Sequence, residues 1–241
     1  MEIYGSDYLI VSSIVFLAAL TQSITGFGFA IVSMSFLPGV VGLQTAVPLV
    51  ALLGFTLNSI IWFYYRRNSD FKAVKRLMIA SLVATPIGAL MLNRFPEAIA
   101  LRGLGLIIIS YVVYDWLKLT LPTLKSRFWD YLAGGLSGTL SGAYAVGGPP
   151  LIVYANCRHW AGKEFKSNIT PVFCSIALMA TISHGWQGNL TTSVSRFAVY
   201  SLPSFSCGLW LGTTLAKKMN PLIFRKITLA LLLVAGLKLL I

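Results

Sequence analysis

Residues 144–150 read Tyr144-Ala145-Val146-Gly147-Gly148-Pro149-Pro150 and lie inside an apolar stretch that covers residues 129–156. Glycine allows backbone conformations that other residues avoid. A proline ends a helix that arrives from upstream but suits the first turn of a helix that starts anew. A second apolar stretch, residues 8–38, contains the similar cluster Thr25-Gly26-Phe27-Gly28-Phe29. Both stretches are therefore predicted to be helices that break at their glycines and then continue.

The composition around these stretches is that of a polytopic membrane protein. Of 241 residues, 56% are hydrophobic and only 11% are charged, whereas a soluble domain carries about 25% charged residues. Six further segments are long and apolar enough to cross a bilayer. These predicted spans cover residues 44–65, 77–93, 99–117, 168–187, 194–215 and 222–241. The net charge of +12 does not indicate a nucleic-acid partner, because the basic residues gather in short loops between apolar segments.

The two halves of the chain resemble each other. Ser23 aligns with Gly142 and Gly28 with Gly147, an offset of 119 residues. Further along, the offset is 124 and pairs Gly88 with Gly212, Arg94 with Lys218, and Arg102 with Lys226. We predict a single all-α membrane domain built from two repeats, residues 1–120 and 121–241. Each repeat consists of one broken segment and three transmembrane helices.

The basic loops predict how the repeats face. The loops at residues 66–76, 118–127, 158–166 and 217–226 hold 15 of the 19 Lys and Arg residues. If each broken segment enters and leaves the membrane on one side, all four loops face the cytoplasm, as the positive-inside rule favours. The repeats are then inverted, and both termini are periplasmic or extracellular in an inner (plasma) membrane. The two arms of the second broken segment differ in length, so the alternative is that this segment crosses the membrane instead of returning to the same side.

The broken helices predict an anion-binding site. Helices that restart in the membrane point N–H groups and the positive end of their dipole at the break. We expect a small anion to bind between Gly26-Phe27-Gly28 and Gly147-Gly148-Pro149. Its side-chain donors would be Gln22, Thr25, Ser141 and Tyr144. Helix packing is the alternative role for these glycines, and it is the role we predict for Gly134, Gly138 and Gly142, which are spaced by four residues.

Two sequence runs resemble the signature motifs of the TauE/SafE sulfite exporter family, also called the toluene-sulfonate uptake permease family. They are residues 22–29, QSITGFGF, and residues 141–150, SGAYAVGGPP. Asn58 and Pro86-Ile87-Gly88 also look like this family, which the chain resembles over its whole length. The chain departs from the family pattern at Ser23, Ala143 and Ala145. The resemblance implies gradient-driven transport of sulfite, thiosulfate or organosulfonates.

Other residues indicate little chemistry beyond transport. Six of the seven carboxylates lie at helix ends or in loops: Glu2, Asp7, Asp70, Glu97, Asp130 and Glu164. Asn58 and His184 are candidates for a supporting or proton-coupling role. For His184 we favour a histidine that is hydrogen-bonded in the interior or lies at the membrane interface. We expect buried Cys174 and Cys207, and no catalytic residue, metal ligand or cofactor. An anion channel and, less favoured, an intramembrane enzyme are the alternative functions, and homo-oligomer formation is left open.

Overall fold

The computed structural model describes residues 5–66, 69–94, 96–117, 123, 126–160, 162–216 and 221–240. Within these residues every regular element is a helix and no strand occurs. The helices in chain order are α1 (Gly5–Thr25), α2 (Phe29–Phe36), α3 (Pro38–Val41), α4 (Leu43–Tyr65), α5 (Phe71–Leu92), α6 (Glu97–Leu117), α7 (Arg127–Tyr144), α8 (Gly148–Cys157), α9 (Gly162–Trp186), α10 (Thr192–Leu215) and α11 (Pro221–Leu240).

Length and composition make five of the described helices, α1, α4, α5, α6 and α9, able to cross a membrane. The prediction of an all-helical polytopic membrane protein is thereby confirmed. Two helices begin well before the apolar segments found in the sequence, α5 at Phe71 and α9 at Gly162. In α5 the reason is a cap, because the Asp70 carboxylate accepts hydrogen bonds from the backbone N–H groups of Lys72 and Ala73. The last residue of the predicted span 222–241 lies outside the described residues.

Both long apolar stretches break at their glycine clusters, as predicted. Helix α1 ends at Thr25, and the chain then passes through Gly26 at φ 90° and Gly28 at φ 109°, both in the left-handed region. Helix α7 ends at Tyr144, and Ala145 follows at φ 55°, an uncommon backbone conformation for a residue with a Cβ. Helix α8 then starts at Gly148 with prolines in its first turn.

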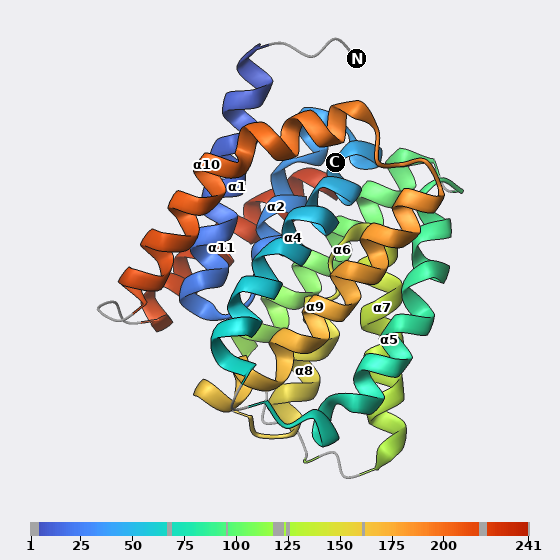
Figure 1. Cartoon of the computed structure of the whole chain (residues 1–241), viewed down its shortest axis with the longest axis vertical. Coiled ribbons are helices and arrows are strands. Elements are labelled where there is room, and N and C mark those ends of the chain that lie inside the picture. The colour runs from blue at the N-terminus through green and yellow to red at the C-terminus, as the bar shows by residue number, and fades with distance from the viewer. Residues whose placement is uncertain are drawn as a thin grey trace. The chain divides into compact units, whose positions relative to one another are not determined.

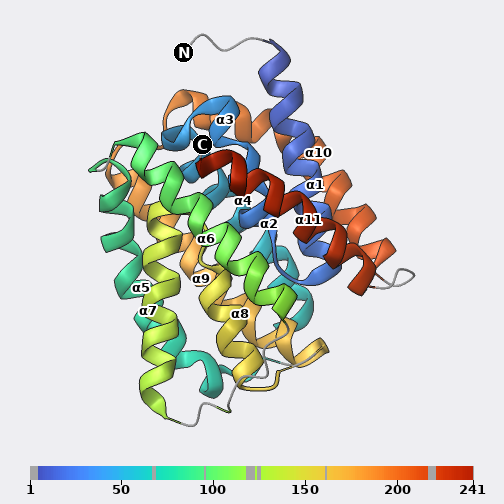
Figure 2. The same cartoon turned by 180° about the vertical axis from the view of Figure 1, so that it is seen from behind.

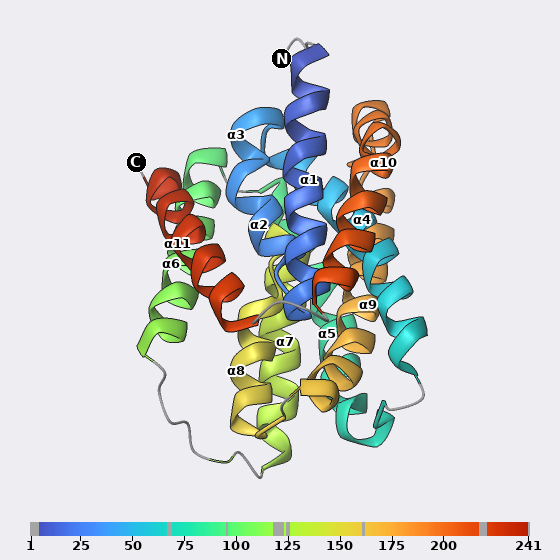
Figure 3. The same cartoon turned by 90° about the vertical axis from the view of Figure 1, so that its left-hand side faces the viewer.

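The chain reverses direction at each break. Helix α2 packs back on α1 (Figure 3), and α8 packs back on α7 (Figure 2). The arms of each hairpin are unequal, with 21 and 8 residues in α1 and α2 and 18 and 10 residues in α7 and α8. A reversal is what a re-entrant segment requires, while the re-entry itself and the inverted orientation of the repeats stay predictions.

One compact unit consists of Met1–Val50, Phe95–Trp116 and Asn189–Ile241. Helix α1 lies along α10 in this unit (Figure 3). Gly208 and Gly212 of α10 sit so close to the backbone of α1 that an added Cβ would overlap atoms of Phe16, Leu20 and Ser23. The close approach of the two helices therefore depends on small residues.

The other compact unit consists of Ala51–Arg94 and Leu117–Gly188. Here α5 and α7 lie side by side (Figure 1). Gly134, Gly138 and Gly142 each face backbone carbonyl groups of α5, so the predicted packing face is confirmed. The α1–α10 and α5–α7 pairs both join a helix from residues 1–120 to one from residues 121–241.

Candidate functional site

The first break is closed by side chains of α1 itself. The Gln22 side-chain oxygen accepts a hydrogen bond of 3.0 Å from the backbone N–H of Phe29, the first residue of α2. The Thr25 hydroxyl lies 2.6 Å from the carbonyl oxygen of Phe27 and 2.9 Å from that of Thr21, and it accepts a bond of 3.3 Å from the Phe27 N–H. Gln22 thus caps the restarting helix, and Thr25 holds the turn between the helices.

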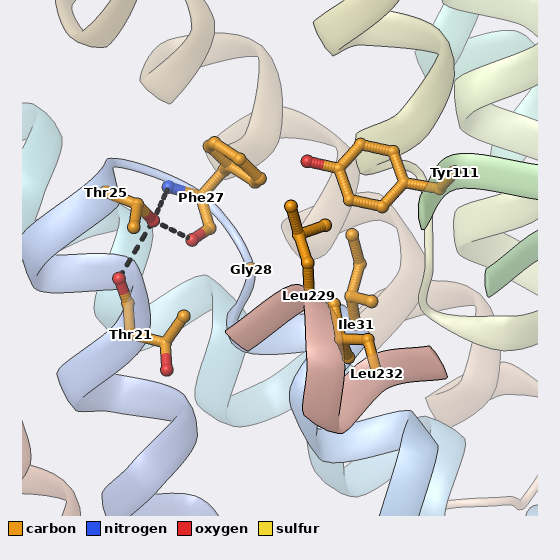
Figure 4. Close-up of a pocket in the computed structure, with 8 residues that line it drawn as sticks. All are labelled: Thr21, Thr25, Phe27, Gly28, Ile31, Tyr111, Leu229 and Leu232. Atoms are coloured by element: carbon orange, nitrogen blue, oxygen red, sulfur yellow. Dashed lines mark hydrogen bonds between the residues drawn. The ribbon is translucent and has the colours of Figure 1, made fainter. Parts of the chain in front are cut away.

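A small cavity lies beside this break (Figure 4). Its volume of about 10 Å³ is close to the space that one water molecule needs. It is lined by Thr21, Thr25, Phe27, Gly28, Ile31, Tyr111, Leu229 and Leu232. The lining is mostly apolar and contains no charged side chain, so any anion that enters must be held by dipoles rather than by a fixed cation.

Tyr111 is a cavity residue that the sequence did not reveal. It comes from α6 and lies across the cavity from Thr25 (Figure 4), with its ring edge-on to Phe27 at a centroid distance of 6.2 Å. Tyr111 is only 3% exposed. Its signal in the sequence was a tyrosine in the middle of an apolar span, where a hydroxyl is costly unless it has a polar neighbour.

The second break is held by serines of α7. The Ser137 hydroxyl donates a hydrogen bond of 2.6 Å to the carbonyl oxygen of Gly147. A Cβ on Gly147 would overlap Ser137 and Ser141, so this glycine is required by close contact rather than by its φ of −85°. Ser141 is buried and Tyr144 is half-buried. The predicted residues of this motif therefore gather around one backbone turn.

Gly148 and Pro149 occupy the start of α8, as predicted for a restarting helix. Neither α8 nor α2 has a side-chain cap from its own N-cap residue, which is Gly147 in α8 and Gly28 in α2. The first turn of a helix leaves N–H groups without partners inside the helix. Because Gln22 accepts from Phe29, and Pro149 and Pro150 have no N–H, each break offers only a few backbone donors to an anion.

The two residues considered for a supporting role lie in the second unit. The Asn58 side-chain amide donates a bond of 2.7 Å to the carbonyl of Gly54 in its own helix. His184 is completely buried in α9, next to the backbone of Gly142. His184 is thus packed within the protein, while its place along the membrane and its role stay predictions.

A buried charge cluster in the second unit was not foreseen. Asp130 belongs to the first turn of α7, yet it is 3% exposed. Its Oδ2 lies 3.1 Å from Nη1 of Arg76 in α5, and its Oδ1 accepts a bond of 2.7 Å from the Tyr154 hydroxyl in α8. The sequence showed a carboxylate at a helix start, but it did not show that three helices meet there.

The remaining polar groups include one correction. Cys174 is buried as expected, but Cys207 is exposed on α10, where an apolar thiol can face lipid. Among the described residues no three His, Cys, Asp or Glu side chains are placed to hold a metal. Gln22, Thr25, Gly26, Phe27 and Gly28 lie in the first unit. Ser141, Tyr144, Gly147, Gly148, Pro149, Asn58 and His184 lie in the second.

Comparisons with known proteins agree with these features. The sequence matches the family described as Sulfite exporter TauE/SafE over residues 11–239. It is 25% identical over 222 residues to a protein of Cupriavidus necator named "Probable sulfite/organosulfonate exporter TauE", and the match covers 89% of this chain and 86% of that protein. No solved structure matches the chain significantly. Because the family match spans nearly the whole sequence, including both helix breaks, the chain belongs to the TauE/SafE sulfite exporter family.

Proposed function

We propose that this protein is a secondary transporter that exports a small sulfur oxyanion or a short organosulfonate, driven by an ion gradient. The observation that carries the proposal is the first break, where Gly28 is the N-cap of the restarting helix α2 and also lines a small cavity. The family match and the printed name of the relative from Cupriavidus necator support the substrate class.

The binding groups in this proposal are the backbone N–H groups of Gly28 at the first break and of Gly147 and Gly148 at the second. Gly26 and Phe27 donate within the first break, and Pro149 has no N–H. Each helix N-terminus carries about half a positive charge, so two of them offset roughly one negative charge. A pyramidal or tetrahedral oxyanion suits such donors because its several oxygens each accept hydrogen bonds. Gln22 acts here as the cap of α2, so its contribution to the anion is the placement of that helix.

The size of the cavity favours a transporter over a channel. Its volume of about 10 Å³ cannot hold a sulfite ion, which is several times larger than one water molecule. Admission of the anion therefore requires movement of the surrounding helices. A site that forms only after movement fits alternating access, whereas an open channel needs a standing path.

The location is part of the proposal. We place the protein in the inner (plasma) membrane, with both termini on the periplasmic or extracellular side and the basic loops in the cytoplasm. The helical hairpins α1–α2 and α7–α8 support this topology, because each returns toward the end from which it started.

The test is uphill flux in proteoliposomes under an imposed proton gradient. Labelled sulfite and methanesulfonate are used in parallel, because a sulfonate stays ionised and cannot leak across the lipid as a neutral acid. We expect accumulation against the substrate gradient, abolished by an ionophore that collapses the proton gradient. Flux that only follows the substrate gradient would indicate the anion channel instead.

Matched glycine variants test the binding groups. Gly147→Ala introduces a Cβ that overlaps Ser137 and Ser141, while Gly135→Ala in the same hairpin meets nothing within 4 Å. In the first unit Gly28→Ala is matched by Gly39→Ala, which also meets nothing within 4 Å. We expect both break variants, and neither control, to lose binding of labelled sulfite while they remain folded. Normal binding by both break variants would refute the proposed site.

A further inference from the structure

Helix α8 is held to α7 by polar contacts at two points. At the break, the Ser137 hydroxyl bonds the Gly147 carbonyl at 2.6 Å. At the other end, the Asp130 carboxylate accepts the Tyr154 hydroxyl at 2.7 Å. The two contacts lie seven residues apart on each helix, which corresponds to about 10.5 Å along an α-helix. This equal spacing is expected for two antiparallel helices that contact each other at two points about two turns apart.

The two fastenings differ in chemistry. The contact at the break is a single bond between neutral groups. The contact at the far end uses both oxygens of the buried Asp130, because Arg76 of α5 lies 3.1 Å from the second oxygen. Arg158 adds a cation 5.7 Å from the centre of the Tyr154 ring. Charge-assisted hydrogen bonds are about twice as strong as neutral ones, so the far end is the stronger fastening.

The corresponding positions in the first unit carry no such cluster. The repeat offsets of 119 and 124 residues pair Asp130 with Val11, Tyr154 with Ser35, and Arg76 with Tyr200. Val11 is fully buried and apolar, and the Ser35 hydroxyl bonds the Ile31 carbonyl within its own helix. The cluster is therefore specific to α8 and is not a general requirement of a helix that returns along its partner.

We propose that Asp130 is a positioning residue that clamps the far end of α8 through Tyr154, and that transport requires release of this clamp. On release, α8 turns about the Ser137–Gly147 contact, which serves as the hinge beside the glycine motif. The proposal rests on the proposed transport function. A half-released state would leave the buried Asp130 carboxylate without its partners, which is strongly unfavourable. The clamp is therefore either closed or open.

Cys157 is a native reporter of this motion. It lies three residues after Tyr154, on the same face of α8, and it is 3% exposed. Release of the far end of α8 exposes its thiol. With Cys174→Ser and Cys207→Ser as the background, the rate at which a thiol reagent labels Cys157 measures the fraction of time that the clamp is open.

The experiment compares Tyr154→Phe with Tyr131→Phe in this background. Both changes remove one tyrosine hydroxyl, but Tyr131 is 49% exposed and adjacent to Asp130 in sequence only. We expect Tyr154→Phe to raise the labelling rate about tenfold or more, the effect of losing a hydrogen bond to a charged group. Tyr131→Phe should stay within about twofold of the parent. Asp130→Asn, which removes the charge that Arg76 and Tyr154 share and leaves one acceptor oxygen for two donors, should raise the rate at least as much as Tyr154→Phe.

The link to transport has its own measurement. Sodium methanesulfonate, compared with sodium chloride at equal ionic strength, should change the labelling rate of the parent about threefold or more, and this response should vanish in Tyr154→Phe. The sulfonate is used because sulfite itself reacts with thiol reagents. Equal labelling of Tyr154→Phe and the parent would overturn the clamp, whether or not the protein transports sulfite. Faster labelling in Tyr154→Phe, with no methanesulfonate response in a parent that transports methanesulfonate, would show that the contact is static and would overturn the inference. If no transport occurs but labelling still rises, the clamp stands and the proposed function fails.

Discussion

The breaks after Thr25 and after Tyr144 share a sequence pattern but are stabilised differently. The first uses two glycines with positive φ and a side-chain amide, Gln22, that caps the next helix. The second uses Ala145 in the left-handed region and a serine that holds the Gly147 carbonyl. A repeated motif therefore conserves the break itself, while the groups that stabilise it are free to differ.

The far ends of the two hairpins differ as well. In the first unit Tyr8 packs on Phe197 and Tyr200, each at a ring-centroid distance of 4.8 Å. In the second unit the ionic cluster of Arg76, Asp130 and Tyr154 occupies the comparable place. Aromatic contacts weaken gradually as groups slide, whereas the buried Asp130 carboxylate, paired with a partly exposed Arg76, becomes an unpaired charge once its partners leave. The second unit is therefore the better candidate for a discrete opening.

The largest expected effect concerns the glycines that let the long helices meet. In Gly142→Ala the new Cβ overlaps backbone atoms of Thr85, Gly88 and Ala89, which cannot move without shifting α5. We expect a loss of about 3 kcal/mol in the free energy of unfolding, measured by thermal melting of the purified protein in detergent. Gly135→Ala, which meets no neighbour, should melt at or above the parent temperature.

The equivalent change in the first unit can be rescued. In Gly212→Ala the nearest atom is Cβ of Ser23 at 2.6 Å, and the Leu20 carbonyl oxygen follows at 2.9 Å. Adding Ser23→Gly removes the nearest contact and should recover part of the lost melting temperature. If Gly142→Ala melts like the parent, or if Ser23→Gly makes Gly212→Ala worse, the packing assigned to these helices is wrong.

The next effect concerns the cap that only the first break uses. Gln22→Met keeps the length of the side chain but leaves the buried Phe29 N–H without its acceptor, at a cost of about 1–3 kcal/mol. Because this N–H belongs to the restarting helix, we expect weaker sulfite binding together with a lower melting temperature. Gln44→Met, at an exposed position, is the control and should change neither. Unaltered binding and melting in Gln22→Met would mean that the amide does not position α2.

A smaller effect concerns the left-handed residue of the second break. Ala145 has φ 55°, which costs a residue with a Cβ about 1 kcal/mol, while glycine adopts it freely. Part of this gain is offset by the larger entropy of glycine in the unfolded chain, so Ala145→Gly should stabilise the protein by about 0.5 kcal/mol. The same substitution at Ala133, inside α7, should destabilise it by about 1 kcal/mol. Melting temperatures that move in the same direction would contradict this account.

Sequence reasoning succeeded where the cause is local. Glycines, joined by prolines in the second cluster, end and restart a helix through the backbone, so residues 26–28 and 147–150 predicted both breaks. The spacing of Gly134, Gly138 and Gly142 likewise marks one helix face, and that face packs closely. The identity of its partner, α5, could not be predicted, because nothing in α7 specifies which distant helix covers its glycines.

Sequence reasoning failed where the cause is distant. Asp130 looked like a surface carboxylate, since its partners lie 54 and 24 residues away and burial depends on their positions. Tyr111 joins the cavity only because α6 and α11 meet the first break. Cys207 was expected to be buried because it is apolar, but hydrophobicity does not separate a core from a lipid-facing surface.

The smallest expected effect concerns the basic loops. The guanidinium of Arg66 lies 4.1 Å from the ring centre of Phe63, and both side chains are exposed. This contact contributes about 0.5 kcal/mol to stability at a surface. Arg66→Gln should therefore lower the melting temperature slightly and change sulfite affinity less than about twofold, with Arg66→Lys as the variant that keeps the charge. Salt screens surface charges, so even this small change in affinity should disappear at high ionic strength. A tenfold loss of sulfite affinity in Arg66→Gln, with normal binding in Gly147→Ala, would place the anion at the basic surface and remove the helix breaks from the binding mechanism.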